Sequence, residues 1–194
     1  MIYKNLAEIF EGLDQTRENI YGRVQHLTPE QYRYQEEPGR WSIAGIVEHL
    51  GGVERRIVMR LQELIGQAES AGTLAPASSN FQAISIDEIL GRSTSTRFQA
   101  PPAFEPKGRL SLDELLERIR GSRIELLAMR PKFEALDLSH VEFPHPAFGP
   151  LDSYEWLVLI VIHESRHLDQ IDRILSCPRF PTSAARMEGA GISK

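Results

Sequence analysis

The chain has 194 residues and a formal net charge of −5, with 41% hydrophobic and 25% charged residues. This length is within the range that one hydrophobic core can serve, and the composition excludes a disordered or fibrous protein. Acidic and basic residues are mixed along the chain, so no basic face is offered to nucleic acid, which we exclude as a partner.

The first predicted helix extends from Tyr3 to about His26, because apolar residues recur there at nearly 3.6-residue spacing. These residues are Leu6, Ile9, Phe10, Leu13, Ile20, Val24 and Leu27. A short helical turn follows at residues 28–31, where a threonine cap precedes proline and a glutamine stands three residues after the cap.

The second predicted helix begins after Ser42, a suitable N-cap residue, and ends after about Gln67. One apolar stripe supports it: Ile43, Ile46, Val47, Leu50, Val53, Ile57, Leu61, Leu64 and Ile65. Residues 70–110 then are rich in Gly, Ser, Thr, Ala and Pro, with a brief helical signal at 85–90. A connection of this length is unusual, and we expect it to cover a site or to pack across the helices.

The third predicted helix opens at the capping box Ser111 to Glu114 and ends before Pro131. Residues 144–150 hold three prolines and a glycine, which predict irregular structure. The fourth helix starts at Asp152, with Glu155 three residues later, and extends to about Ser176.

Four long amphipathic helices without a convincing alternating strand pattern predict an all-α protein, a four-helix bundle with a long connection between its second and third helices. We expect a single domain over residues 1–178 and a weakly ordered tail over 179–194. The N-terminal residues lack the apolar region of an export signal. The longest apolar run, Trp156 to Ile162, is far shorter than the roughly 20 residues that span a bilayer. We therefore expect a cytoplasmic protein without a membrane partner.

Two histidines stand four residues apart in the fourth helix, at His163 and His167. This spacing places both imidazoles on one side of a helix, where they can bind the same metal ion. The apolar run before them indicates that the helix is enclosed, and unpaired polar groups would be costly there. The alternative is that both are ordinary hydrogen-bonded histidines of a bundle.

A third ligand must come from another helix, and His49 is the best candidate. It lies beside Leu50 on the flank of the second helix's stripe, together with Gly45 and Gly52. Small residues there let another backbone approach or leave room for a substrate. His26, His140 and His145 are weaker candidates; His145 can line the mouth of a site, but a plain loop position accounts for it.

Residues 163–167 also spell the zincin motif, in which Glu164 would be the general base of a metalloprotease. That motif needs a further ligand downstream, and no histidine follows His167. We therefore set peptidase activity aside and keep Glu164 as a candidate catalytic residue, either a base or a group that orients a ligand. It can equally pair with Arg166 or with an arginine of another helix such as Arg123.

Several motifs resemble the DinB/YfiT-like superfamily over nearly the whole chain. They are Trp41-Ser42 followed by His49-Leu50, the stretch from Ala100-Pro101-Pro102 through residues 106–111, and His145-Pro146-Ala147-Phe148-Gly149-Pro150 leading into residues 163–170. The resemblance implies an up-down-down-up bundle with a divalent metal held by His49, His163 and His167. In that family the metal is nickel, zinc or another divalent ion such as iron or manganese, and some relatives are thiol-dependent S-transferases or isomerases. It also implies a homodimer.

Three neutral imidazoles leave a metal ion its full charge and an open coordination position. Such an ion can activate a thiol or a water at neutral pH. The leading hypothesis is therefore a metal-dependent thiol S-transferase or hydrolase that acts on a small-molecule substrate, with a low-molecular-weight thiol as cosubstrate. The alternative is a non-catalytic, dimeric binding protein whose metal is structural or absent.

Overall fold

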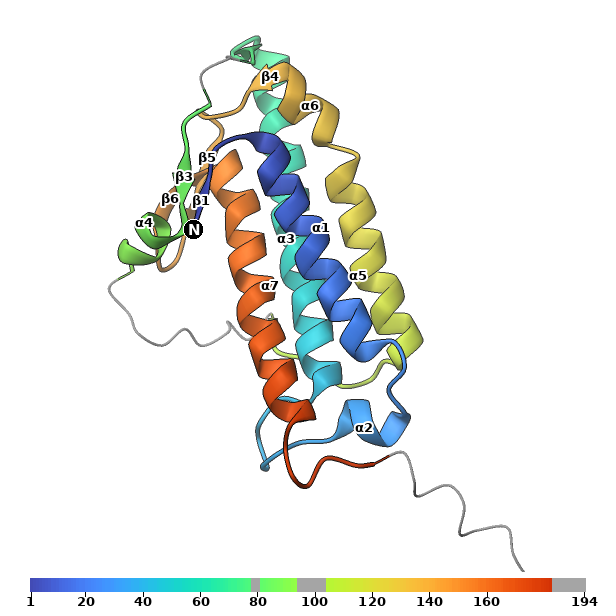
Figure 1. Cartoon of the computed structure of the whole chain (residues 1–194). Helices are drawn as coiled ribbons and strands as arrows, with labels where there is room; N and C mark the ends of the chain where they lie inside the picture. The colour runs from blue at the N-terminus through green and yellow to red at the C-terminus, as the bar shows by residue number, and fades with distance from the viewer. Residues whose placement is uncertain (78–80, 94–103, 183–194) are drawn as a thin grey trace, which may run out of the picture.

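Four long helices form the bundle in the computed structural model, which describes residues 1–77, 81–93 and 104–182. The helices are α1 (Leu6–Val24), α3 (Ile43–Ala71), α5 (Leu112–Leu127) and α7 (Ser153–Leu175). In Figure 1, α1 and α7 run in one direction while α3 and α5 run in the other. The predicted all-α, up-down-down-up four-helix bundle is thus confirmed. The main contacts join α3 to α5, α1 to α7 and α3 to α7.

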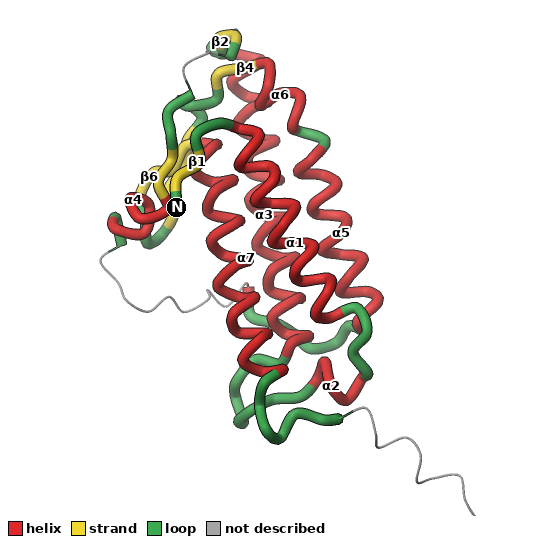
Figure 2. Tube along the Cα trace, in the orientation of Figure 1, coloured by secondary structure: helices red, strands yellow, loops and turns green. Residues whose placement is uncertain are grey.

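Shorter elements fill the connections between the long helices. The short helices are α2 (Pro29–Arg33), α4 (Ile86–Gly91) and α6 (Arg130–Ala135). The strands are β1 (Ile2–Tyr3), β2 (Ala75–Pro76), β3 (Ile84–Ser85), β4 (Leu136–Asp137), β5 (Glu142–His145) and β6 (Gly149–Asp152). They pair antiparallel as β1 with β3, β2 with β4, and β5 with β6. Figure 2 shows the strands gathered at the end of the bundle where α1 and α7 begin.

Side-chain caps define where the long helices begin. Ser42 accepts a hydrogen bond from the backbone of Gly45, and Ser111 and Asp152 each form a capping box with the glutamate three residues later. The predicted starts of α3, α5 and α7 are therefore confirmed. Helix α1 begins at Leu6 rather than Tyr3, because Asn5 caps it and Ile2–Tyr3 pairs with β3.

The segment between α6 and α7 forms a hairpin, and the expectation of irregular structure over residues 144–150 was wrong. Strands β5 and β6 pair in a register that sets Pro144 opposite Pro150. Two prolines facing each other both lack an N–H, so they occupy a pair of the ladder that exchanges no hydrogen bonds. Gly149 has a φ of 74°, a left-handed conformation that closes the short loop.

The core consists of two apolar clusters, one toward each end of the bundle. On each long helix, one buried charged side chain lies between the residues of one cluster and those of the other. These residues are Arg17, Glu54, Arg123 and Glu164. We call these four residues the charge layer. Two arginines balance two glutamates, so the layer is neutral as a whole, and its members satisfy one another's hydrogen bonds.

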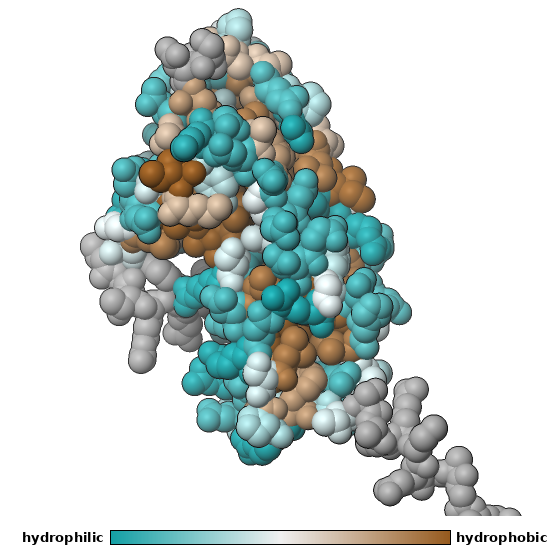
Figure 3. All heavy atoms as spheres, viewed as in Figure 1, coloured by the Kyte–Doolittle hydropathy of each residue, from teal (hydrophilic) through white to brown (hydrophobic). Residues whose placement is uncertain are grey.

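The surface carries mostly hydrophilic side chains on the face that Figure 3 shows, with smaller apolar patches between them. The exposed large apolar side chains of the described residues are Met1, Ile2, Met59, Leu90 and Ile124. No helix within the described residues is long and apolar enough to cross a membrane. Of the predicted tail, residues 183–194 lie outside the described residues, as do residues 78–80 and 94–103 of the long connection and with them residues 100–102 of the motifs named above.

Candidate metal centre

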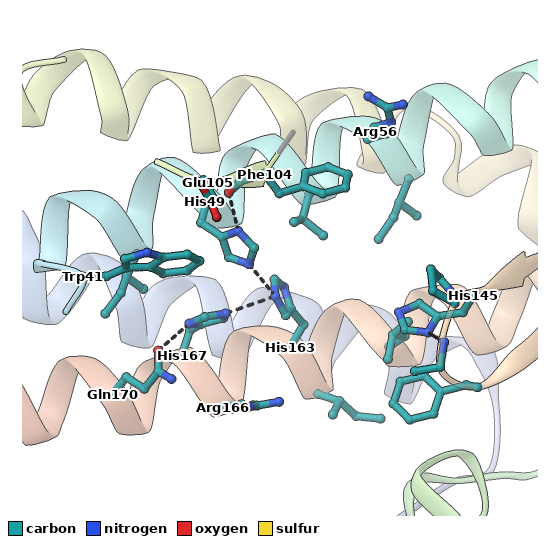
Figure 4. A pocket seen from close by; sticks show the side chains of 18 of the residues that line it. Trp41, His49, Arg56, Phe104, Glu105, His145, His163, Arg166, His167 and Gln170 are labelled. Atoms are coloured by element: carbon teal, nitrogen blue, oxygen red, sulfur yellow. Dashed lines mark hydrogen bonds between the residues drawn. The ribbon is translucent and has the colours of Figure 1, made fainter. Parts of the chain in front are cut away.

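Three imidazoles from two helices meet between α3 and α7. His49 lies on α3, and His163 and His167 lie one turn apart on α7. The Nε2 atoms of His49 and His163 are 3.0 Å apart, and those of His167 and His163 are 3.1 Å apart. Figure 4 shows the three rings turned toward one another. The structure thus brings together the three histidines that the sequence singles out as candidate ligands.

The outer nitrogens of two rings determine where their protons lie. His49 Nδ1 donates to the carbonyl oxygen of Phe104 at 2.9 Å, and His167 Nδ1 donates to Gln170 Oε1 at 2.8 Å. Because both oxygens only accept, each neutral ring has a lone pair on Nε2. Both lone pairs face His163 Nε2, which carries at most one proton and satisfies only one of them. The surplus of lone pairs at this point favours a cation.

Burial keeps the three imidazoles neutral. Burial lowers the pKa of His49 below its ordinary value of 6.5. Burial and the neighbouring charge of His49 lower the pKa of His167 to about 4. Burial, followed by the charges of His167 and His49, lowers the pKa of His163 well below its ordinary value. The neutral ring is the form that binds a metal, so the site is ready for one at neutral pH.

The three nitrogens fit a divalent ion in number, chemistry and spacing. One ring nitrogen from each histidine lies within 4.8 Å of the others. An ion bound tetrahedrally at about 2.0–2.1 Å from each nitrogen would hold two nitrogens about 3.3 Å apart. This is close to the 3.0 and 3.1 Å that separate His163 Nε2 from the Nε2 atoms of His49 and His167. The hydrogen bonds from Nδ1 to oxygen acceptors are those that usually orient metal-binding histidines. Imidazole ligands suit zinc, nickel, iron and copper alike.

The end of the long connection lies directly on α3 beside His49. A side chain at Gly45 would approach Pro106 to 3.2 Å, so a residue without one lets this segment come close. Glu48 accepts hydrogen bonds from the backbone N–H groups of Lys107 and Gly108 at 3.0 and 2.9 Å. This part of the connection therefore covers the site, one of the two roles that the sequence leaves open for it, and supplies the Phe104 carbonyl. At Gly52, by contrast, a side chain would meet open space.

The indole ring of Trp41 lies against two of the three imidazoles. Trp41 stacks on His167 with ring centroids 6.2 Å apart and an interplanar angle of 14°. Its centroid is 4.8 Å from that of His49. Trp41 thereby limits the rotation of both rings and shields them from water.

Glu164 belongs to the charge layer, and its carboxylate is occupied there. It accepts hydrogen bonds from Arg17 Nε at 3.0 Å, from Arg123 Nη2 at 3.1 Å and from Thr16 Oγ1 at 2.5 Å. Its pairing with Arg123, one of the two alternatives that the sequence leaves open, is confirmed. Glu164 is not among the residues that line the cavity over the three imidazoles. The geometry therefore supports a structural position for Glu164 and offers no support for a catalytic one.

The sequence gives little warning of this layer, although one signal is present. Arg17 occupies a stripe position between Leu13 and Ile20, and Glu54 does the same between Leu50 and Ile57. A charge at a position that the helical period assigns to the core predicts a buried partner on another helix. The partner itself cannot be read from the chain.

The remaining histidines lie apart from the three imidazoles, with one exception. His26 and His140 are exposed. His145 is the last residue of β5 and lines the same cavity as the three imidazoles. It stacks on Phe148 with ring centroids 4.6 Å apart, and its Nδ1 accepts the backbone N–H of Ala147. It is a wall of the site and not merely a loop residue.

A cavity of about 880 Å³ opens over the three imidazoles. Helices α3 and α7 form two of its walls, and the β5–β6 hairpin, Trp41 and Phe104 complete it. Its volume is enough for a small organic molecule together with a second small reactant. Of the described residues that line it, Glu105 is the one with a carboxylate.

Residues 12–171 match the family model described as the DinB superfamily. A protein of Bacillus subtilis (strain 168) called uncharacterized protein YuaE is 22% identical over 162 residues, which cover 83% of this chain and 93% of that protein. A solved structure described as TT2238, a four-helix bundle protein, has a TM-score of 0.59 at 21% identity. That match covers 87% of this chain and 99% of the other and bears on the fold alone.

Proposed function

Because this chain belongs to the DinB superfamily, we propose that it is a metal-dependent enzyme whose divalent ion is held by His49, His163 and His167. The observation that carries the proposal is the convergence of two Nε2 lone pairs on a third imidazole nitrogen beneath an open cavity. A purely structural site would be closed by a fourth protein ligand. We propose zinc or nickel as the metal, with iron or manganese as alternatives.

The chemistry we propose is the transfer of a low-molecular-weight thiol to an electrophilic carbon of a small molecule. The carbon–sulfur bond forms as the carbon's bond to a leaving group, or a π bond, breaks, and the thiol proton passes to the leaving group or to solvent. A divalent ion bound here supplies Lewis-acid chemistry that makes a thiol or a water nucleophilic near neutral pH. A free thiol has a pKa of about 8.5, whereas that of water is about 15.7, so the thiol needs much less activation. Among the described residues, the cavity lining includes a single carboxylate, Glu105, and Glu164 is held by arginines, so these residues offer little general-base assistance to water. Thiol transfer is therefore the first choice and hydrolysis the second.

The residues around the three imidazoles prepare the site for this reaction. The Phe104 carbonyl and Gln170 hold His49 and His167 in the tautomer that turns Nε2 toward the centre. Trp41 lies against His49 and His167 and limits the access of water to the ligand nitrogens, which strengthens electrostatic interactions there.

The first test is metal analysis of protein purified without an affinity tag. We expect close to one equivalent of a divalent metal in the native chain and none retained after His163→Ala. His140→Ala is the matched control, because His140 is exposed and outside the cavity. Substoichiometric metal that is the same in native protein and in His163→Ala would overturn the site.

The second test is a screen of small thiols against electrophiles with metal-loaded protein, with esters and amides included to detect hydrolysis. We expect consumption of thiol and electrophile in equal amounts, lost in His49→Ala and retained in His140→Ala. Bound metal without any turnover that depends on His49 would favour the alternative, a dimeric binding protein with a structural metal. Sedimentation of the same samples would show whether a homodimer forms.

A further inference from the structure

The cavity over the three imidazoles is rich in arginine, although the chain as a whole is acidic. In the part of the chain that the structure describes, its lining includes Arg40, Arg56, Arg60, Arg166 and Arg173 and one carboxylate, that of Glu105. The whole chain has a formal net charge of −5. Low-dielectric walls concentrate the field of such charges inside a cleft. The cavity is therefore richer in positive charge than the chain as a whole and favours anionic ligands.

Three of these arginines already have carboxylate partners. Arg40 pairs with Glu37 at 3.7 Å, Arg60 with Glu63 at 2.6 Å, and Arg173 with Glu36 at 3.3 Å. The glutamates partly neutralise these three arginines, which therefore attract a ligand less strongly.

Arg56 and Arg166 differ, since neither forms an ion pair with any residue that the structure describes. The Arg56 guanidinium lies over the ring of Phe104, 5.5 Å from its centroid. Arg166 lies beside His163 and His167 in sequence, and its charge helps to lower the pKa of both. Figure 4 shows Arg56 on the α3 side and Arg166 on the α7 side of the three imidazoles. Two guanidinium groups without carboxylates thus flank the candidate metal centre.

The end of the cavity formed by the hairpin is aromatic. Phe143 stacks on Trp156 with ring centroids 4.1 Å apart and an interplanar angle of 9°. His145 stacks on Phe148, and burial lowers its pKa, so its ring is neutral at neutral pH. Because His145 Nδ1 accepts the N–H of Ala147, the proton of the neutral ring lies on Nε2. This end offers flat apolar surfaces and one hydrogen-bond donor.

We propose that the cavity binds an amphipathic carboxylate, with the guanidinium of Arg166 or of Arg56 pairing with the carboxylate and the aromatic end formed by Phe143, Phe148 and Trp156 receiving an apolar body. This inference rests on the proposed function, since it names the class of small molecule that the same site accepts. A planar guanidinium forms two charge-assisted hydrogen bonds with a carboxylate, a pairing that a neutral alcohol cannot match. An anion without an apolar body would leave the aromatic surfaces wet, and an apolar body without an anion would leave the arginines unpaired.

The test measures binding to the full chain after metal has been removed by dialysis against EDTA. The chain has two tryptophans, Trp41 and Trp156, and both line the cavity, so intrinsic fluorescence reports its occupancy. The probes are hydrocinnamate, which has both features, hydrocinnamyl alcohol, which lacks the charge, and acetate, which lacks the apolar body. We expect hydrocinnamate to bind about tenfold more tightly than either of the others, as one charge-assisted contact would provide.

Variants separate the two arginines from the general charge of the protein. We expect Arg56→Gln combined with Arg166→Gln to lower hydrocinnamate affinity about tenfold and to leave the alcohol unchanged. Arg55→Gln is the matched control, because Arg55 is the exposed neighbour of Arg56 and does not line the cavity. Unchanged binding of the alcohol also shows that the double variant is folded.

Two results would overturn this inference: equal affinity of the native chain for acid and alcohol, or hydrocinnamate affinity that survives the double substitution. Neither depends on metal or turnover. A native chain that prefers the acid but takes up no metal would refute the proposed function and leave the carboxylate site intact. A chain that binds metal and transfers thiols but does not prefer the acid to the alcohol would support the proposed function and refute the carboxylate site.

Discussion

Gln170 acts on the candidate metal centre through a single hydrogen bond. Its Oε1 accepts the Nδ1 proton of His167 at 2.8 Å and so keeps the lone pair of that ring on Nε2. Loss of the hydrogen-bond partner of a metal-binding histidine typically lowers metal affinity by about 10–100-fold. The orientation of His167 thus depends on a residue three positions further along α7.

We predict that Gln170→Leu weakens metal binding at least about tenfold, because His167 loses the acceptor that fixes its tautomer. The measurement is a competition titration against a chromophoric chelator. Gln67→Leu is the control, since Gln67 is an exposed glutamine on α3 and does not line the cavity. Equal affinities in the native chain and Gln170→Leu would show that the tautomer is set in another way.

The residues of the site differ in how far the sequence predicts them. The four-residue spacing of His163 and His167 places both on one side of a helix, and His49 follows from its flank position and from the family resemblance. The Phe104 carbonyl could not be foreseen, because a backbone oxygen has no sequence signature and lies 55 positions from its partner. The arginines of the cavity were missed for a related reason. An exposed arginine on a helix looks the same whether it faces solvent or a cavity.

At the scale of elements, the charge layer links all four long helices at one level. Arg17 Nη2 contacts Glu54 at 2.8 Å and also contacts Glu164, while Arg123 Nε contacts Glu54 at 2.8 Å. Removing one member of a buried ion pair leaves an uncompensated charge and costs about 3–5 kcal/mol. The layer therefore makes the position of each helix depend on the others.

We predict that Glu54→Gln lowers the free energy of unfolding by about 3–5 kcal/mol, measured by denaturant titration at pH 7. Glu63→Gln on the same helix should change it by less than about 1 kcal/mol, because its pair with Arg60 is exposed. A loss in Glu54→Gln no larger than in the control would contradict a stabilising role for the layer.

The Glu54→Gln variant also tests how the free energy of unfolding depends on pH. Burial raises the pKa of Glu54, but the charges of Arg17 and Arg123 outweigh it and hold the pKa below the ordinary 4.5. A carboxyl with a lowered pKa adds stability above its unfolded pKa and loses it as the pH falls through its folded pKa. The difference in unfolding free energy between the native chain and Glu54→Gln should thus be constant above about pH 5 and shrink below about pH 4.5.

Helix starts were the most predictable elements, because a cap and a glutamate three residues later form a local signal. The hairpin of β5 and β6 was missed because its prolines argue against a strand when each is considered alone. Only the register that sets Pro144 opposite Pro150 makes them compatible with pairing. Pairing of this kind is not visible in the residues of one strand.

For the whole molecule, the candidate metal centre joins two helices that are far apart in sequence. His49 comes from α3 and the other two imidazoles from α7, so a bound ion would connect them. A ligand that binds only the folded state stabilises it in proportion to the logarithm of its free concentration over its dissociation constant. The helix order that makes this possible was implied by the family resemblance, since periodicity alone fits many bundles.

We predict that adding a divalent metal to EDTA-treated protein raises the melting temperature by several degrees, equivalent to about 4 kcal/mol at a thousandfold excess over the dissociation constant. His163→Ala should melt at the same temperature with and without metal, and His140→Ala should respond like the native chain. An equal rise in His163→Ala would place the ion elsewhere. Scanning calorimetry or near-ultraviolet circular dichroism measures the effect.

The position of Phe104 affects any attempt to transplant this site into another protein. Copying the three histidines onto two helices of a designed bundle would reproduce the ligands but not the carbonyl that orients His49. The recipient would also need a glycine at the position of Gly45 and an acceptor like Glu48 to hold an incoming loop. The smallest portable unit is therefore two helices together with a piece of the chain that leads into a third.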